Sequence, residues 1–155
     1  MNGEGVTIAI CEGGPPFAHV DFANRLVQGP IDAVFHSTHV TGIAAGAGNI
    51  FTRYKGYAPR ASIITNSRYF SYFSLQNPMN DAGMVLANHS FGGGVSCFTG
   101  YNIFTIQFDR EPNDFPTLLN VFAAGNSGTF ACGNGYTPGF GNVVANANSA
   151  KNSLT

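Results

Sequence analysis

Charged residues are scarce in this sequence of 155 residues. Only 10% are Asp, Glu, Lys or Arg, where an average protein has about 25%. Seven Lys and Arg face eight Asp and Glu, for a formal net charge of -1. Nucleic-acid binding needs a concentrated basic surface, which seven scattered cations cannot supply. We therefore expect no nucleic-acid partner.

Long apolar runs are also missing. No run approaches the roughly 20 residues that a membrane-spanning helix requires, so we expect no membrane partner. Residues 1–5 have neither the basic nor the apolar region of a signal peptide. Two alternatives stay open here: a cytosolic protein, or a fragment whose targeting segment lies upstream.

Cysteine is rare and tryptophan is absent. An odd number of cysteines excludes a fully paired disulfide framework, and the spacing of Cys11, Cys97 and Cys132 matches no zinc motif. The sequence instead has a 44% hydrophobic fraction with 14 Phe and 6 Tyr, which indicates one packed, compact domain.

The sequence contains uninterrupted apolar runs, which are typical of strands buried on both faces. Between these runs lie segments with the apolar spacing of helices. This order predicts an α/β domain with a mainly parallel sheet. The first helix should have Val40, Ile43 and Ala44 on one side, and the second should stop at Pro112. The expected strands cover residues 6–11, 61–65, 84–88 and 118–124, and the expected helices cover 36–46 and 101–110.

Polar or glycine-rich clusters follow three of these strands, at residues 12–14, 90–93 and 125–128, and a fourth cluster opens the first helix at 36–39. In parallel sheets, ligands bind at the carboxyl ends of strands, so the clusters predict one site. His36 is its candidate general base. Considered without the surrounding residues, His36 and His39 favour other interpretations over the general base: two structural histidines, or an HxxH metal pair that lacks its third ligand.

Six segments together resemble the conserved blocks of subtilisin-like serine peptidases, the subtilases, in the order of that family. Residues 36–46 (HSTHVTGIAAG) are similar to the block H-G-T-H-V-A-G-x-x-A-G. The segment Asn88-His89-Ser90 resembles the corresponding segment of secreted bacterial subtilases. The other matching segments are GVTIAICEGG (5–14) with HVDF (19–22), GYAPRA (56–61), NHSFGG (88–93), VFAAGNSG (121–128) and AKNSLT (150–155).

The resemblance implies a three-layer subtilisin-like fold and a role for each matched position. Glu12 would be the triad acid, His36 the general base and Asn126 the oxyanion donor. Two segments would bind an extended peptide or protein substrate: the edge segment Ser90, Phe91, Gly92 and Gly93, and the pocket wall Ala123, Ala124 and Gly125.

The sequence departs from the family pattern twice. Position 12 is Glu where the family has Asp, and the extra methylene displaces the carboxylate unless the backbone compensates. The segment that should carry the nucleophilic serine does not occur among residues 1–155. We therefore interpret residues 1–155 as a partial catalytic domain, inactive alone, whose nucleophile follows Thr155.

Cys97 and Cys132 fall in loops next to matched blocks, where free thiols would be open to oxidation. We expect them to form a disulfide, in agreement with a secreted or extracellular protein, and expect Cys11 to be a small core residue. We expect no cofactor and no metal. Subtilases often bind structural calcium, but Asp21 and Asp32 read as loop residues.

The leading hypothesis is a serine endopeptidase, monomeric in its complete form. The main alternative is a non-catalytic peptide-binding module of the same fold, in which Glu12 marks a degenerate triad. A nucleotide-binding α/β domain is disfavoured because no G-x-G-x-x-G motif follows the first strand.

Overall fold

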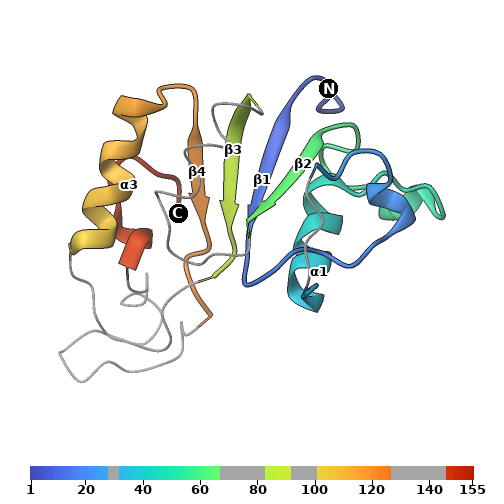
Figure 1. The fold of residues 1–155 in the computed structure, drawn as a ribbon, viewed down its shortest axis with the longest axis horizontal. Coiled ribbons are helices and arrows are strands. Elements are labelled where there is room, and N and C mark those ends of the chain that lie inside the picture. The colour runs from blue at the N-terminus through green and yellow to red at the C-terminus, as the bar shows by residue number, and fades with distance from the viewer. Residues whose placement is uncertain (28–31, 67–82, 92–100, 127–145) are drawn as a thin grey trace. The chain divides into compact units, whose positions relative to one another are not determined.

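The computed structural model describes residues 1–27, 32–66, 83–91, 101–126 and 146–155. Four strands form one sheet in the order β2-β1-β3-β4 (Figure 1). Two compact units divide the chain: an N-terminal unit, residues 1–88, and a C-terminal unit, residues 89–155. The strands are β1 (Thr7–Cys11), β2 (Ser62–Asn66), β3 (Met84–His89) and β4 (Leu119–Phe122), the helices α1 (Phe35–Ala45) and α3 (Ile103–Asp114), and the 3-10 turns Val20–Phe22, Thr52–Tyr54 and Asn146–Ser149.

The strand β1 is buried along its whole length, as its unbroken apolar sequence predicts. It pairs in parallel with β2, with Thr7 opposite Ser62 and Cys11 opposite Asn66. A further parallel bridge joins Leu26 to Ile63 beyond β2. These pairings, with helices packed on the strands, confirm the predicted α/β fold.

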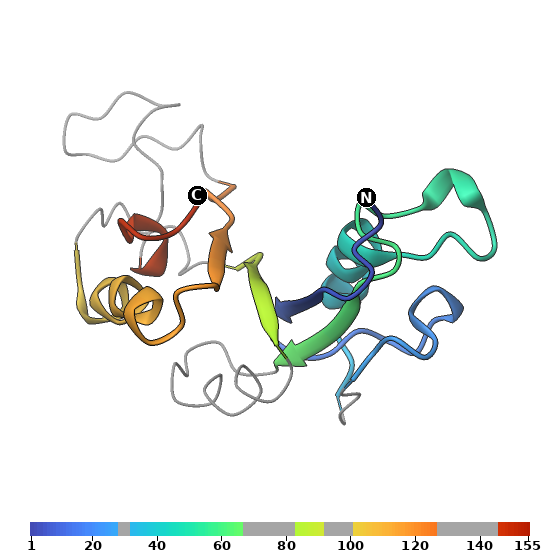
Figure 2. The ribbon, with the colours of Figure 1, turned by 90° about the horizontal axis from the view of Figure 1, so that it is seen from above.

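Helix α1 packs beside β1 and β2 (Figure 2). Its buried residues are Ser37, Thr41 and Ala45, which recur at the four-residue spacing of one helix face. Small side chains on that face let the helix approach the strands closely. The side chain of Ile43 is 53% exposed, because position 43 lies opposite the face formed by the buried residues of the helix.

The segment that follows α1 caps the carboxyl end of that helix. Backbone N–H groups of Gly56, Tyr57 and Ala58 donate to the carbonyls of Gly46, Ile43 and Ala44. These carbonyls belong to the last turn of a helix, where no intrahelical donor remains. A Cβ on Gly56 would lie 2.7 Å from the Gly42 carbonyl oxygen, so only glycine fits this contact.

Helix α3 begins at a capping box, in which Asn102 and Thr105 satisfy each other's free backbone N–H groups. The expected end at Pro112 is wrong, since the helix continues to Asp114. Proline lacks one backbone N–H, but the residues after it can still complete a helical turn. Phe115 N–H accordingly donates to the Glu111 carbonyl at 2.8 Å.

The strand β4 is shorter than predicted and ends at Phe122. Its outer neighbour is the segment around Leu154, which forms a parallel bridge with Val121. Phe122 packs with Phe108 of α3, their ring centroids 4.9 Å apart, so the helix covers this strand. In the described residues, no helix is long and apolar enough to cross a membrane.

Arg25 holds three segments of the N-terminal unit together. Its guanidinium donates to the carbonyls of Ala61 (2.8 Å) and Ala45 (2.6 Å) and to the Asp21 carbonyl. These acceptors belong to the start of β2, the end of α1 and the turn at Val20–Phe22. One side chain therefore satisfies carbonyls from three elements.

We predict that Arg25→Met lowers the free energy of unfolding by about 2 kcal/mol, because hydrogen bonds from a charged donor are lost, among them those to the carbonyls of Ala45 and Ala61. Chemical denaturation measures this. Arg53→Met, which changes an exposed arginine in the turn at Thr52–Tyr54, is the control and should stay within about 0.5 kcal/mol. Equal losses in the two variants would contradict the role given to Arg25.

Candidate active site

Glu12 and His36 form a hydrogen-bonded pair in the N-terminal unit. Glu12 directly follows β1, and His36 lies in the first turn of α1. The Oε2 atom of Glu12 lies 2.8 Å from Nδ1 of His36. The glutamate side chain is 3% exposed, whereas the histidine side chain is 56% exposed. A buried acid thus contacts an accessible imidazole.

Backbone contacts bring the two residues together. After Glu12, the chain turns at Gly14, where a Cβ would lie 2.6 Å from the Asp32 carbonyl oxygen and from Val34 Cγ2. Val34 N–H donates to the Pro15 carbonyl at 2.7 Å. The segment after β1 is thereby held directly against the start of α1, and the longer glutamate side chain reaches the imidazole.

Thr38 fixes the same junction from the helix side. Its hydroxyl accepts from Phe17 N–H at 2.8 Å and donates to the Val34 carbonyl at 3.1 Å. The hydroxyl therefore ties the chain after Gly14 to the first turn of α1.

The hydrogen bond determines which nitrogen of His36 is basic. An ionised carboxylate can only accept, so the shared proton lies on Nδ1 and the lone pair on Nε2. Because the imidazole is accessible, Nε2 can take a proton from a hydroxyl group. Within the described residues, Glu12 Oε1 is buried without a hydrogen-bond partner, as are the hydroxyls of Ser37 and Thr41.

The remaining predicted site residues belong to the C-terminal unit. Ser90 and Phe91 follow β3 and are half-buried. The residues after β4 are exposed, and Gly125 has a φ of 114°, a conformation that favours glycine. The exposed residues are Ala123, Ala124, Gly125 and Asn126. Gly92, Gly93, Cys97 and Cys132 lie outside the described residues.

The sequence model of the subtilase family matches residues 3–155, nearly the whole chain. The chain belongs to the subtilase family. Thermitase from Thermoactinomyces vulgaris is 29% identical over 167 aligned positions, which cover 97% of this chain and 57% of thermitase. The chain thus spans a little more than half the length of this curated relative.

Solved structures of proteases share the fold. The CspB protease of Clostridium perfringens superimposes with a TM-score of 0.62 at 20% identity, over 82% of this chain and 37% of that protein. The serine protease of Aeromonas sobria gives 0.62 at 25% identity, over 85% of this chain and 27% of that protein. These similarities confirm the predicted subtilisin-like architecture.

This subtilase chain also contains a buried polar cluster that the sequence analysis missed. Asn120 joins His89 to Glu111: its Oδ1 lies 2.8 Å from His89 Nε2, and its Nδ2 donates to Glu111 Oε2. The exposed fractions are 2% for His89, 0% for Asn120 and 1% for Glu111. The available signal was Asn120, a polar residue inside an otherwise apolar predicted strand.

Burial shifts the pKa values of the two ionisable groups of this cluster in opposite directions. Loss of water lowers the pKa of His89 to about 4, against a smaller opposing effect of the Asn120 hydrogen bond. Loss of water raises the pKa of Glu111 to about 7, an effect that Asn120 opposes and Asp114 increases. Near pH 5.5 both side chains are therefore neutral in the folded protein.

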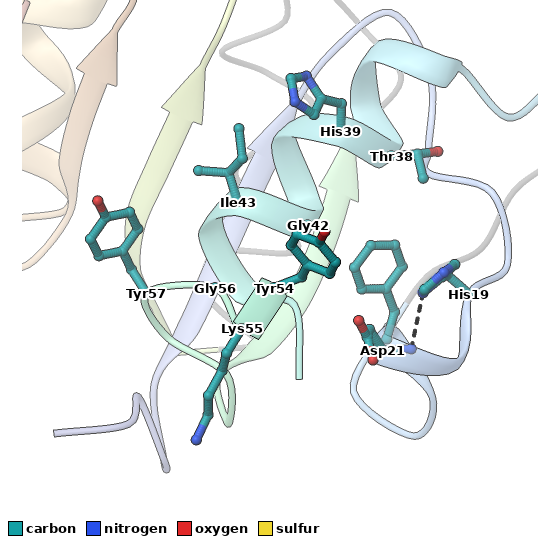
Figure 3. Close-up of a pocket in the computed structure, with 11 residues that line it drawn as sticks. His19, Asp21, Thr38, His39, Gly42, Ile43, Tyr54, Lys55, Gly56 and Tyr57 are labelled. Atoms are coloured by element: carbon teal, nitrogen blue, oxygen red, sulfur yellow. Dashed lines mark hydrogen bonds between the residues drawn. The ribbon is translucent and has the colours of Figure 1, made fainter. Parts of the chain in front are cut away.

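A cavity of about 470 Å³ also opens in the N-terminal unit (Figure 3). Neither Glu12 nor His36 lines it. Asp21 lies at its edge, and its Oδ1 accepts from Asn49 N–H at 2.7 Å, so this carboxylate serves the loop after α1. Across the described residues, no group of three or more His, Cys, Asp or Glu could hold a metal ion. The wall comprises His19, Asp21, Phe22, Thr38, His39, Gly42, Ile43, Tyr54, Lys55, Gly56 and Tyr57.

Cys11 is buried in the N-terminal core at 3% exposure, as expected of a small core residue.

The opposed pKa shifts predict a stability that hardly changes between pH 4.5 and 6.5. Below pH 6.5 the unfolded state binds a proton at His89 that the folded state does not, so stability falls as pH falls. Above pH 4.5 the unfolded state releases a proton from Glu111 that the folded state retains, so stability falls as pH rises. The two slopes cancel in this window.

Single substitutions should remove the cancellation. Glu111→Gln should make the protein about 2 kcal/mol more stable at pH 6.5 than at pH 4.5, and His89→Gln should give the opposite difference. Urea denaturation at the two pH values, relative to the unaltered protein, measures both. Parallel pH profiles in all three proteins would contradict the assignment.

Proposed function

We propose that this chain is part of a serine endopeptidase that cleaves peptide bonds with an acid–histidine–serine triad. The observation that carries the proposal is the 2.8 Å hydrogen bond between buried Glu12 and accessible His36. Family membership supports the reaction class. The nucleophilic serine belongs to a segment beyond Thr155, which fits the 57% coverage of thermitase.

In this mechanism His36 takes the serine proton on Nε2 while serine attacks the scissile carbonyl, and later gives that proton to the leaving amine. Glu12 keeps the Nδ1–H tautomer and stabilises the imidazolium that forms in the transition state. Its burial strengthens this effect, because water does not screen the carboxylate.

Two segments of the C-terminal unit complete the proposal. Asn126, exposed after β4, donates from its side-chain amide to the oxyanion of the tetrahedral intermediate. Ser90, Phe91, Gly92 and Gly93 pair with the backbone of an extended peptide, as in strand addition. Ala123, Ala124 and Gly125 form the wall of the pocket for the residue before the scissile bond.

A peptide-binding module without turnover is the second candidate. It is favoured by the buried Glu12 Oε1, which has no hydrogen-bond partner among the described residues. A triad carboxylate works best when both oxygens are held, so an unpartnered oxygen is the feature expected of a degenerate triad. Substrate turnover by the complete protein separates the two candidates.

We predict that Glu12→Gln in the complete protein lowers kcat by roughly 10⁴, as loss of the acid's charge does in the same kind of triad on another fold. His36→Ala should cost at least as much, and the double variant little more, because triad members act as a unit. Glu12→Asp should retain activity. Steady-state kinetics on a peptide substrate measures these effects.

Glu4→Gln is the matched control, since Glu4 is an exposed carboxylate paired with Arg60 at 2.9 Å. It should leave kcat unchanged. Full activity in Glu12→Gln would show that another group is the triad acid. No turnover by the unaltered complete protein, with retained binding of an extended peptide, would favour the peptide-binding module.

We further propose that the protein is secreted and that Cys97 pairs with Cys132. Abundant Asn, Gly and aromatic residues with few lysines support the location, and an oxidising compartment supports the bridge. Mass analysis of protein from its native compartment, alkylated without reduction, should find one bridge and one alkylated residue, Cys11. Three alkylated cysteines would contradict both parts of the proposal.

A further inference from the structure

His89 lies at the centre of the buried cluster of the C-terminal unit. Its ring stacks on Phe122 with centroids 4.3 Å apart and an interplanar angle of 13°. Phe108 and Phe91 contact it edge-on at 5.3 and 5.7 Å. One imidazole therefore packs against the last residue of β4 and against the residue two positions after itself.

The backbone of His89 holds the chain after β4 as well. Its carbonyl accepts from Ala123 N–H at 3.0 Å. The Ala123 carbonyl in turn accepts from Asn148 Nδ2 at 2.5 Å, and Asn148 is 5% exposed. Both backbone groups of Ala123 are thus fixed at the point where β4 ends.

The side chain of His89 is fixed by a chain of polar contacts. Asn120 donates to Glu111 with its amide nitrogen, so its oxygen faces His89 and accepts from Nε2–H. Glu111 comes from α3, Asn120 from β4 and His89 from β3. Three elements therefore set the orientation of one ring.

Few ionisable groups lie near the polar contacts that join His89, Asn120 and Glu111. Glu111 has His89 on the β3 side and Asp114 on its own helix, while β4 and residues 146–149 contribute none. On α3, Asp109 contacts Tyr101 and the N–H groups of Lys151 and Asn152, and Arg110 is adjacent in sequence. Within the described residues, no cation pairs with Glu111.

We propose that His89 is a positioning residue for substrate binding, which holds Ser90–Phe91 and Ala123–Ala124 in place through the Asn120–Glu111 chain. This rests on the proposed function, because those segments are the ones assigned to an extended peptide. His89 directly precedes Ser90, and its stacking partner Phe122 directly precedes Ala123. A rotation of the ring would displace both peptide-binding segments, whereas the Glu12–His36 pair does not depend on it.

The experiment measures the dissociation constant of an unmodified alanine-rich hexapeptide in the complete protein carrying His36→Ala, so that peptide is bound without cleavage. His89→Leu, which keeps the approximate volume but not the donor, should weaken binding about ten-fold. His89→Gln places an amide N–H where the ring Nε2–H lies and should restore binding to within about three-fold. Val85→Thr, at an exposed position of β3, is the control.

Glu111→Met provides a second test that does not depend on a folded His89→Leu protein. Methionine has a similar volume but leaves the buried Asn120 amide donor without its acceptor, so some loss of stability accompanies the change. It leaves the Asn120 amide free to turn, so binding should weaken about three-fold.

Kinetics of the protein with His36 intact separate positioning from general damage. His89→Leu should raise KM for the hexapeptide while kcat for acetyl-alanine methyl ester, which lacks an extended backbone, changes less than three-fold. Unchanged hexapeptide binding in both His89→Leu and Glu111→Met would overturn the proposal, as would equal losses on peptide and ester. Absence of turnover in the unaltered protein would refute only the peptidase function, since hexapeptide binding still decides the role of His89.

Discussion

The close approach of the chain after β1 to the start of α1 is the constraint on which the acid–histidine pair depends. Gly14 allows that approach, because a Cβ there would lie 2.6 Å from the Asp32 carbonyl oxygen. The hydrogen bond from Val34 to Pro15 then closes the junction. With the backbone fixed, the buried Glu12 carboxylate has a defined reach to the imidazole, which explains how a glutamate side chain contacts His36 at this position.

The sequence alone predicted β1 well, since the continuous burial of this strand leaves an unbroken apolar pattern that needs no tertiary information. The buried face of α1 and the end of α3 were harder to predict from the sequence. The apolar side with Val40 and Ile43 does not identify the packed face, because the helix is packed through small residues whose burial depends on how close the strands come. These residues are Ser37, Thr41 and Ala45. Pro112 predicts a helix end, but a proline in the last turn removes only one hydrogen bond, and Phe115 N–H still donates to the Glu111 carbonyl.

The candidate site also contains residues that the sequence alone predicts and residues that only the structure reveals. Glu12 and His36 were found because each lies in a local motif, immediately after a strand or at the start of a helix. The cluster of His89, Asn120 and Glu111 has no local signature, since its members come from three elements separated in sequence. Asn120 reads as an ordinary polar residue until the structure brings a buried acid and a buried imidazole to its two ends. Only tertiary packing makes such a group interpretable.

The two histidines show how one fold sets opposite properties for the same side chain. His36 contacts its acid directly at 2.8 Å and keeps about half of its side chain exposed to water. His89 is separated from its acid by an amide, so no ion pair can form, and burial lowers its pKa to about 4. The Asn120 amide fixes the orientation of the His89 ring relative to Glu111 but does not carry a proton between them. A histidine in the first environment is suited to moving protons, and one in the second is suited to holding neighbouring backbone in place.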